Sequence, residues 1–267
     1  MLNLRAVKGR AYPRLTAAFR APSWMITDIL LPLGSIAAFI WYYRAIGAPE
    51  VYAGFVILGG TMTAFWLNVL WRMAAQFYWE KEIGNFQLFQ MAPMSNMALL
   101  AGMALGGMFF TSMQALATLA LGIFIFGVSM TVTSYPLLIA VFTLTLIALY
   151  GMGMALSSLY LVYGRTAWHM TMILEEPVFL LSGFYFPVRN LGLFVGLIAS
   201  ALPITLGLDG IRQVLFPVEE TMPLMPVEWE VLILGIMAVV FLIIAKKVLD
   251  RMEYIGRKEG RLTLRWQ

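Results

Sequence analysis

Ionisable side chains inside long apolar runs are the residues of this sequence that could do chemistry. Arg165, His169 and Glu176 recur at a spacing that places them on one stripe of a helix, where they could form an ion-paired or proton-sharing cluster. Glu175 stands beside Glu176, but adjacent residues on a helix point about 100° apart, so both cannot join that cluster. A catalytic acid–base pair must converge on one point. We therefore expect either a pathway or gating role for these glutamates, or a structural polar bond between helices.

A second series of polar residues lies at the end of another apolar run. Asn68, Arg72 and Gln76 follow one another at i, i+4 and i+8, which places them on one helix face. They could line an entrance at that end of the run, or link the run to the segment that follows. The alternative for Arg72 is that its long side chain only reaches out to a membrane interface. If the apolar runs span a membrane, each polar residue inside them is costly and therefore a candidate for function.

The composition indicates that these runs do span a membrane. Of the 267 residues, 61% are hydrophobic and 12% are charged, whereas a soluble domain carries roughly a quarter charged residues. The chain has no cysteine and a single histidine, which excludes disulfide scaffolds, cysteine-ligated zinc, iron–sulfur clusters, thiol catalysis and a multi-histidine metal site. We expect an all-α membrane protein with a single transmembrane domain over residues 1–267, and no catalytic residue, metal or cofactor in this chain.

Six apolar runs predict six membrane-spanning helices. Between the last two of them, residues 191–202 are apolar but reach only roughly 18 Å as a helix, and Pro203 separates them from a second short stretch, residues 204–216. We predict that residues 188–216 form a re-entrant or interfacial helical hairpin on the outer side, tolerated because protein buries its backbone ends. The six runs are residues 24–43, 51–71, 97–128, 135–163, 168–187 and 231–245.

The distribution of basic residues predicts the orientation in the membrane. Six spans place both termini on one side, and 15 of the 18 lysines and arginines fall on that side, whereas only Arg44, Arg189 and Arg212 fall opposite. Because cytoplasmic loops carry an excess of basic residues, both termini are predicted to be cytoplasmic. The net charge of +4 is then explained by the basic cytoplasmic segments of a membrane protein, and no nucleic-acid partner is expected.

The N-terminal segment, residues 1–23, is basic and carries one apolar stripe, which favours a helix lying in the inner headgroup layer. Pro13 argues against one unbroken helix, and a disordered basic tail is the alternative. Asp28 interrupts the following apolar run, which argues against a cleaved signal peptide. The stripe consists of Leu4, Val7, Ala11, Leu15 and Ala18.

The segment between the second and third runs, residues 76–95, is then cytoplasmic. It predicts a short amphipathic helix, with Phe77 and Leu88 on its apolar side and the charged residues 80–82 in solvent. Gly84 allows a sharp bend or a close approach of the backbone. An ordinary cytoplasmic loop is the alternative from physical argument alone.

This segment resembles the coupling loop of type-2 ABC exporter permeases, in which Glu-Arg/Lys-Glu-x-Gly-Thr-x-Glu-x-Leu is followed by Pro-x-Ser. Asn85 and Gln87 stand where the pattern has Thr and Glu. In that family the loop forms a coupling helix, which docks in a groove of a separate ATPase subunit. The resemblance extends this role to the matching residues, which are Glu80, Lys81, Glu82, Gly84, Leu88, Pro93 and Ser95.

Further segments resemble the same family. Residues 176–187 are similar to its Pro-x-x-Phe-Leu-Ser-Gly-x-Phe-Phe-Pro motif with one extra leucine, and residues 202–205 and 209–212 are similar to Leu-Pro-Leu-Thr and Asp-Gly-Leu-Arg. These motifs add Pro203, Asp209 and Arg212 as hairpin residues. The candidate residues for a substrate path or gate are Asn68, Arg72, Arg165, His169, Glu175, Glu176, Ser182 and Gly183.

The resemblance implies a permease subunit of an ATP-driven exporter in a bacterial or archaeal cytoplasmic membrane. The sequence has no Gly-x-x-x-x-Gly-Lys-Ser/Thr phosphate loop, so ATP and Mg²⁺ are expected on a partner ATPase present in two copies. A second permease copy, identical or related, would complete the pore. Gly102 and Gly106 form a small-xxx-small pair that favours close helix packing.

The expected substrate is hydrophobic or amphiphilic: a drug, a lipid or a lipid-linked molecule. The leading alternative is a proton-coupled secondary carrier that uses Glu175 and Glu176 as its relay. Such a carrier would transport without any ATPase. An intramembrane enzyme is disfavoured, because no acid or nucleophile cluster converges on one point.

Overall fold

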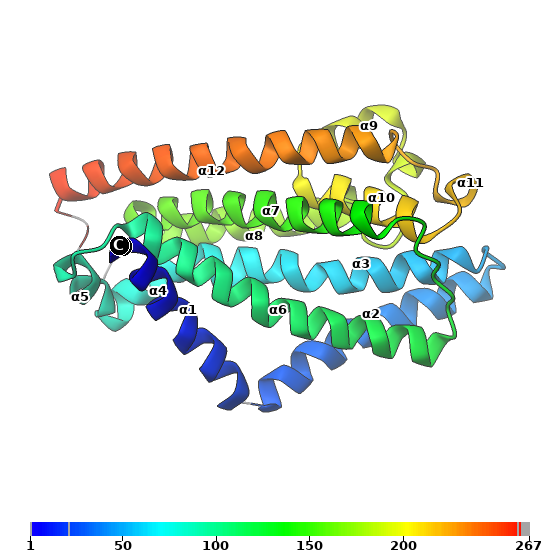
Figure 1. Ribbon diagram of the computed structural model, residues 1–267, viewed down its shortest axis with the longest axis horizontal. Coiled ribbons are helices and arrows are strands. Elements are labelled where there is room, and N and C mark those ends of the chain that lie inside the picture. Colours follow the sequence, from blue (N-terminus) through cyan, green and yellow to red (C-terminus); the bar gives the residue numbers. More distant parts are fainter. Residues whose placement is uncertain (1, 21, 261, 263–267) are drawn as a thin grey trace.

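The computed structural model of the protein describes residues 2–20, 22–260 and 262, in which every regular element is helical. The long helices run roughly along one common axis (Figure 1). In chain order the elements are α1 (Leu2–Arg20), α2 (Pro22–Ala45), α3 (Val51–Leu67), the π-helix η1 (Asn68–Ala74), α4 (Gln76–Ile83), α5 (Asn85–Met91), α6 (Asn96–Phe126), α7 (Tyr135–Tyr163), α8 (Arg165–Leu181), the 3₁₀-helix η2 (Val188–Leu191), α9 (Leu193–Ala199), α10 (Pro203–Leu215), α11 (Val218–Thr221) and α12 (Val227–Lys258).

The predicted all-α membrane fold is confirmed. Five helical segments are long and apolar enough to cross a bilayer: Met25–Ala45, Val51–Ile83, α6, α7 and α12. The pair α9 and α10, bent by 114°, would make a sixth if counted as one broken span. Helix α8 has 17 residues, at the lower limit of the roughly 17–25 that a span needs. The chain is therefore a multi-pass membrane protein with five or six apolar spans.

The predicted boundaries agree with the structure where turn residues close a helix. The fourth run, residues 135–163, coincides with α7, which a proline opens and Gly164 ends. The last run was predicted to end at Ala245, but α12 continues to Lys258. The predicted apolar run thus lies inside a longer helix, since the basic residues beyond Ala245 end the apolar stretch and not the helix.

Helix α3 is the centre of the bundle, and most of its residues are buried. Two adjacent glycines make this position possible. A Cβ atom on Gly59 would lie 1.4 Å from the carbonyl oxygen of Phe184, and one on Gly60 would lie 2.4 Å from the Ile36 side chain. The glycines thus let the turn after α8 and helix α2 approach α3 directly, which brings three separate parts of the chain around one space.

Helix α1 is unbroken through Pro13, so the predicted interruption there is wrong. It packs along α6 instead of lying free: a Cβ atom on Gly102 would lie 2.6 Å from the backbone oxygen of Val7, and one on Gly106 would lie 3.1 Å from that of Ala11. The predicted small-xxx-small pair therefore forms the contact between these two helices. Figure 1 shows α1 and α2 diverging in a V at the edge of the bundle.

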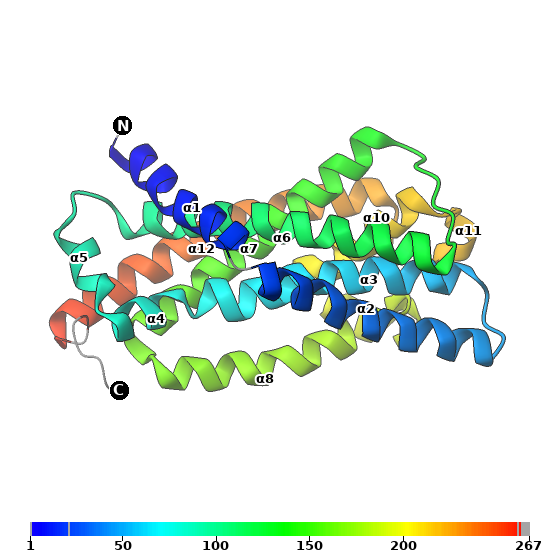
Figure 2. The same ribbon diagram turned by 90° about the horizontal axis from the view of Figure 1, so that it is seen from below.

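The predicted amphipathic segment consists of two short helices, α4 and α5, with a bend between them at Gly84, whose φ is 86°. A left-handed backbone of this kind favours glycine. Helix α6 then begins at a side-chain cap, since the Ser95 hydroxyl accepts a hydrogen bond from the Ala98 amide at 3.1 Å. Figure 2 shows α4, α5, the start of α1 and the end of α12 at the same end of the bundle, which we call the loop end.

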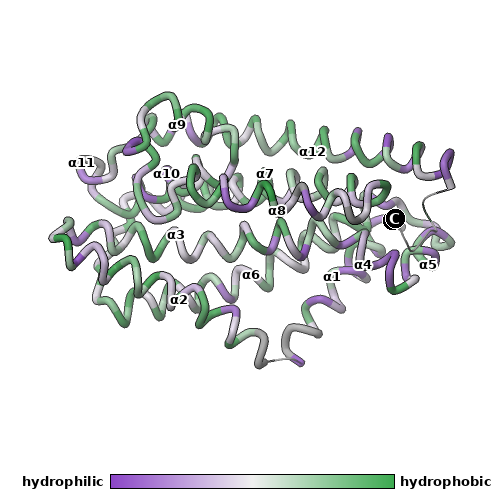
Figure 3. The backbone as a smooth tube through the Cα atoms, turned by 180° about the vertical axis from the view of Figure 1, so that it is seen from behind, coloured by the Kyte–Doolittle hydropathy of each residue, from purple (hydrophilic) through white to green (hydrophobic). Residues whose placement is uncertain are grey.

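The opposite end, which we call the hairpin end, holds α9, α10 and α11 (Figure 1). The two short helices predicted after the fifth run are present as α9 and α10, and every residue of α10 is buried. Figure 3 shows hydrophilic segments gathered at the loop end and near α11, with a mostly hydrophobic middle. A bilayer would cover this middle zone.

Candidate functional site: a cavity beside the central helix

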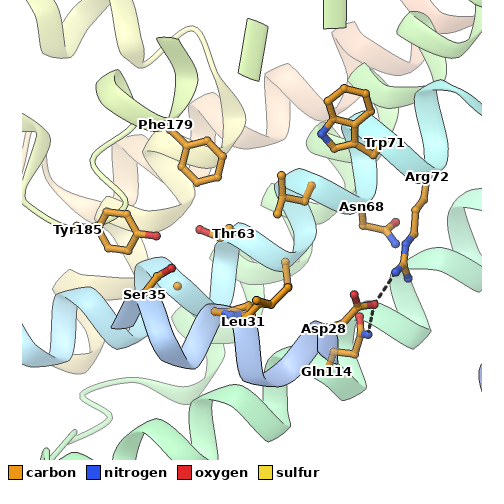
Figure 4. Close-up of a pocket in the computed structure, with 14 residues that line it drawn as sticks. Asp28, Leu31, Ser35, Thr63, Asn68, Trp71, Arg72, Gln114, Phe179 and Tyr185 are labelled. Atoms are coloured by element: carbon orange, nitrogen blue, oxygen red, sulfur yellow. Dashed lines mark hydrogen bonds and ion pairs between the residues drawn. The ribbon is translucent and has the colours of Figure 1, made fainter. Parts of the chain in front are cut away.

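A cavity of about 440 Å³ lies beside the central helix, between α2, α3, η1, α6 and the chain around α8 (Figure 4). Its size falls within the roughly 300–1,000 Å³ typical of small-molecule sites. The lining residues are Asp28, Leu31, Pro32, Ser35, Gly60, Thr63, Ala64, Leu67, Asn68, Trp71, Arg72, Gln114, Phe179 and Tyr185.

One side of the cavity is polar and charged. Arg72 and Asp28 form an ion pair at 2.5 Å, and the Gln114 amide donates to the same Asp28 oxygen at 2.8 Å (Figure 4). Asn68 accepts a hydrogen bond from the Tyr150 hydroxyl at 3.0 Å. The rest of the wall is aromatic and aliphatic, with the hydroxyls of Ser35, Thr63 and Tyr185 near one another at the far side (Figure 4). The cavity is thus amphipathic, with fixed charges concentrated at one edge.

The π-helix η1 places three lining residues in this wall. An α-helix has 3.6 residues per turn, whereas a π-helical turn is wider and is frequently found at functional sites. Here Asn68, Trp71 and Arg72 belong to η1 and all three line the cavity. A change of winding in the middle of a buried helix thus turns this set of polar and aromatic side chains toward one space.

Behind the cavity, a chain of contacts leads to the loop end. The Arg14 guanidinium donates to the backbone oxygen of Arg72 at 3.1 Å and also to the Gln76 side chain. Gln76 in turn donates to Glu80 at 2.7 Å, and Arg10 forms an ion pair with Glu80. Burial and the neighbouring Arg10 charge lower the pKa of Arg14 to about 10, so Arg14 stays charged near neutral pH. These contacts connect α4 to the charged edge of the cavity through α1.

The path residues on α8 whose side chains are described, His169, Glu175 and Glu176, do not gather as one cluster. Glu175 is half-buried and accepts a hydrogen bond from the Trp71 indole at 3.0 Å, while His169 and Glu176 are exposed. Arg165 begins α8, but its side chain lies outside the described residues. Within the described part of the chain, no ion pair joins His169 to Glu176. The prediction that the two adjacent glutamates diverge is confirmed.

The predicted residues Ser182, Gly183 and Arg212 meet at the hairpin end. Gly183 has a φ of 68° and lies in the turn after α8. Arg212 is fully buried, and its guanidinium donates to the backbone oxygens of Gly183 at 2.7 Å, Phe184 at 3.0 Å, Phe186 at 3.2 Å and Phe55 at 3.4 Å. Arg212 thus fastens this turn and α3 to α10. The buried Ser182 hydroxyl has no hydrogen-bond partner among the described residues.

The other two hairpin residues also take part in the packing of this end. Pro203 is at the first position of α10, where its missing N–H costs nothing. The carboxylate of Asp209 is buried and accepts a hydrogen bond from the Leu224 amide at 2.8 Å. It therefore holds the segment that leads from α11 into α12.

The predicted docking residues divide into a buried and an exposed set. Glu80 is only 5% exposed, so its predicted place in solvent is wrong; the ion pair with Arg10 explains its burial. Lys81 donates to the backbone oxygen of Leu161 at 3.0 Å. Leu88, predicted on the apolar side of the segment, is 59% exposed, whereas Phe86 of the same helix is buried. Glu82 and Gly84 are partly exposed, and Pro93 is exposed.

Among the predicted site residues, only Asn68 and Arg72 line the cavity. Asp28, Gln114, Thr63 and Tyr185 were not predicted as site residues. Asp28 carried a usable signal, because a lone carboxylate inside an apolar run is costly and needs a partner. The described residues hold no cluster of three or more His, Cys, Asp or Glu that could bind a metal ion.

Comparison with known proteins agrees with this architecture. A family model described as ABC-2 type transporter matches residues 15–216, a stretch that contains every cavity-lining residue, the α4–α5 loop and α10. No curated protein matches the chain. Since the match covers more than half of the 267 residues, the chain belongs to the ABC-2 type transporter family, the permease component of type-2 ABC transporters.

Proposed function

We propose that this chain is the membrane-spanning subunit of an ATP-driven exporter and that the cavity beside η1 is part of its substrate path. The observation that carries the proposal is the amphipathic cavity, with its Asp28–Arg72 ion pair at one edge, joined by direct contacts to the α4–α5 loop. A cavity of this kind suits a hydrophobic or amphiphilic substrate such as a drug, a lipid or a lipid-linked molecule. ATP and Mg²⁺ bind to the partner ATPase in this scheme.

The partner ATPase docks on the α4–α5 loop. Four large apolar side chains are exposed there, Trp79 at 45%, Ile83 at 67%, Leu88 at 59% and Met91 at 76%. Helices α4 and α5, which carry them, lie at the loop end, away from the hydrophobic middle (Figure 3). Glu80 does not touch the partner; it holds α1 against the loop through Arg10. A push on α4 therefore reaches α1 and then the backbone of Arg72.

Two permease copies and two ATPases make the working transporter. Helices α2 and α8 expose apolar side chains to their surroundings, among them Leu30, Leu31, Ile173 and Leu180, and a second copy would cover part of this surface. Both termini and the loop end face the cytoplasm of a bacterium or archaeon, and α9 with α10 forms the re-entrant hairpin on the outer side. The distribution of basic residues supports this orientation.

The test is purification from native membranes in a mild detergent, followed by reconstitution with the ATPase that is recovered. We expect an ATPase subunit of roughly 25–35 kDa, the size a single nucleotide-binding domain needs. Leu88→Asp should abolish its recovery, because a charge would be buried at the interface. The matched control Gln87→Glu adds the same charge at the exposed neighbouring position and should leave recovery unchanged.

The proton-coupled carrier remains the outcome that would overturn the proposal. Transport that persists without any ATPase, and that Glu175→Gln abolishes, would establish it. ATP-dependent transport that survives Glu175→Gln and Glu176→Gln would exclude a relay at these residues.

A further inference from the structure

A second cavity, of about 450 Å³, opens at the hairpin end and has a composition different from the first. Its walls are largely aromatic and aliphatic, and one carboxylate stands at its rim. The side chains that matter are Tyr43 from α2, Tyr52 from α3, Phe186 and Asn190 from the segment after α8, and Glu220 and Met222 at and after α11. The two cavities are neighbours. The Tyr43 hydroxyl in the wall of the second donates to the backbone oxygen of Tyr185 at 3.2 Å, and Tyr185 lines the first.

The polar groups of this second cavity are already engaged, except for one. The Tyr43 hydroxyl is bound to Tyr185, and the Asn190 amide donates to the Tyr52 hydroxyl at 3.3 Å. The Glu220 carboxylate is exposed and makes no ion pair or hydrogen bond within the described residues. The nearby Glu50 is neutralised by Arg44 at 3.3 Å. Glu220 therefore contributes the one unpaired charge among the described residues that line this cavity.

Basic side chains do not supply the missing partner. Arg189 is beside Asn190 in the chain, but its guanidinium donates to the backbone oxygen of Pro223 at 2.9 Å, and Arg189 does not line the cavity. The Arg212 guanidinium also lies near these aromatic rings, but it is fully buried and bonded to backbone oxygens. The exposed Glu220 carboxylate, which lines the cavity, has no ion-pair partner among the described residues.

The rings of Tyr43 and Tyr52 meet at an angle and do not form one flat surface. The centroids of Tyr43 and Tyr52 are 5.1 Å apart with an interplanar angle of 51°. A sugar ring stacks flat on one exposed ring, and two rings set at this angle do not form such a flat surface. A cation, by contrast, is attracted by the face of each ring it approaches. Rings set at an angle, together with one carboxylate, therefore favour a positively charged ligand.

The backbone at the rim of the cavity adopts an uncommon conformation. Met222 has a φ of 46° and is the one non-glycine residue with a positive φ in the described chain. Such a conformation is costly for a residue with a side chain and is retained mostly at ligand-binding and functional sites. It ends the short helix that carries Glu220 and adds an exposed, polarisable methionine to the wall.

We propose that the cavity of Tyr43, Tyr52, Phe186 and Glu220 binds a monovalent organic cation with an apolar body. The ammonium or phosphonium centre lies between the rings and the Glu220 carboxylate, and the apolar groups contact Val51 and Met222. Quaternary ammonium groups are bound by aromatic residues in the same way. The ligand can be a free cationic amphiphile or the headgroup of a choline lipid.

The experiment uses two probes of the same shape and opposite charge, tetraphenylphosphonium and tetraphenylborate. Binding of each is measured by equilibrium dialysis to the full chain in detergent without ATP, so the result does not depend on transport or on the ATPase. The proposal expects the phosphonium to bind at least roughly tenfold more tightly than the borate. Glu220→Gln should weaken phosphonium binding about five- to tenfold, and Tyr43→Leu about two- to fivefold, while Tyr43→Phe, which keeps the ring, should not.

The matched control is Glu228→Gln, which removes another exposed glutamate near the same end, one that does not line the cavity. Equal binding of the two probes, or the same loss in Glu220→Gln and Glu228→Gln, would overturn the proposal. Nanodiscs distinguish the two sources of the cation. If a choline headgroup occupies the cavity, phosphatidylcholine weakens phosphonium binding relative to phosphatidylethanolamine, which has the same net charge but no quaternary ammonium; if a free amphiphile does, the two lipids give equal binding.

Discussion

Single residues decide the chemistry of the first cavity, and the Asp28–Arg72 pair is the most informative of them. Both side chains are partly exposed to the cavity, so the pair contributes little to stability; partly exposed pairs are typically worth about 0–1 kcal/mol. Gln114 adds a third contact to the same carboxylate. A polar group that is expensive in a bilayer and contributes little to stability is best explained by a role in the path.

Reversing one charge of this pair should therefore damage transport more than folding. In Asp28→Arg or Arg72→Asp, two like charges face each other, and we expect ATP-dependent transport in proteoliposomes to fall roughly tenfold, with unfolding free energy changed by only about 1 kcal/mol. The double exchange should restore most of the transport, because the Gln114 amide can turn and accept from an arginine. A double variant as inactive as the single ones, but equally stable, would show that the orientation of the pair matters and not the pairing.

Arg212 has the opposite role at the residue scale, since it is fully buried and bonded to four backbone oxygens. Arg212→Ala leaves the turn oxygens of Gly183, Phe184 and Phe186 without this donor, at about 1–3 kcal/mol for each buried one. We expect a loss of roughly 3 kcal/mol or more, and hence a melting temperature lower by about 6–12 °C for a chain of this size.

The conservative variant and an exposed arginine test this assignment in thermal unfolding. Arg212→Lys should recover only part of the loss, because a single ammonium group lacks the planar fork of donors. Arg189→Ala removes one exposed bond to Pro223 and should cost no more than about 1 kcal/mol. If Arg212→Ala were no more harmful than Arg189→Ala, Arg212 would not be the residue that fastens the turn.

At the scale of elements, sequence reasoning located the helices well and their contacts poorly. Apolar runs, glycines and prolines are local signals, so α7 and the bend at Gly84 were predicted at the right residues. The burial of Glu80 could not be predicted, because its partner Arg10 lies 70 residues earlier in the chain. The same holds for the cavity: Asp28, Arg72 and Gln114 come from three helices, and the winding of η1, which sets their directions, leaves no periodic trace in the sequence.

The packing of α1 on α6 gives a prediction at this scale. A Cβ atom on Gly102 would lie 2.6 Å from the Val7 backbone oxygen, and backbone cannot move aside as a flexible side chain can. Gly102→Ala should therefore push α1 away from α6. Because the natural chain has no cysteine, the pair Asn3→Cys and Ser95→Cys reports on this contact; their side chains are 3.4 Å apart in the native protein.

We expect the disulfide between these two cysteines to form readily with glycine at position 102 and several-fold less with alanine. The control is Gly235→Ala on α12, where a Cβ atom meets nothing within 4 Å; it should leave cross-linking unchanged and, as a helix glycine replaced by alanine, stabilise by about 0.5–1 kcal/mol. Equal cross-linking in all three proteins would mean that α1 does not need the close approach at Gly102.

At the scale of the whole molecule, the two ends of the bundle differ in their exposed surfaces and in their contacts. The loop end presents exposed apolar side chains on α5 and is joined to the first cavity through Arg14. The hairpin end is fastened by Arg212 and holds the second cavity. In the proposed exporter, the ATPase would act at the loop end and the substrate would leave at the hairpin end.

The proposed orientation can be tested on intact cells, since introduced cysteines have no natural background. Glu82→Cys lies at the loop end, and Ser129→Cys and Glu228→Cys lie at the hairpin end. The excess of basic residues on the terminal side predicts that the loop end is cytoplasmic. A membrane-impermeant maleimide should then label Ser129→Cys and Glu228→Cys in spheroplasts and label Glu82→Cys only after lysis. The reverse pattern would invert the topology and with it the proposed direction of export, because the ATPase must dock where ATP is present.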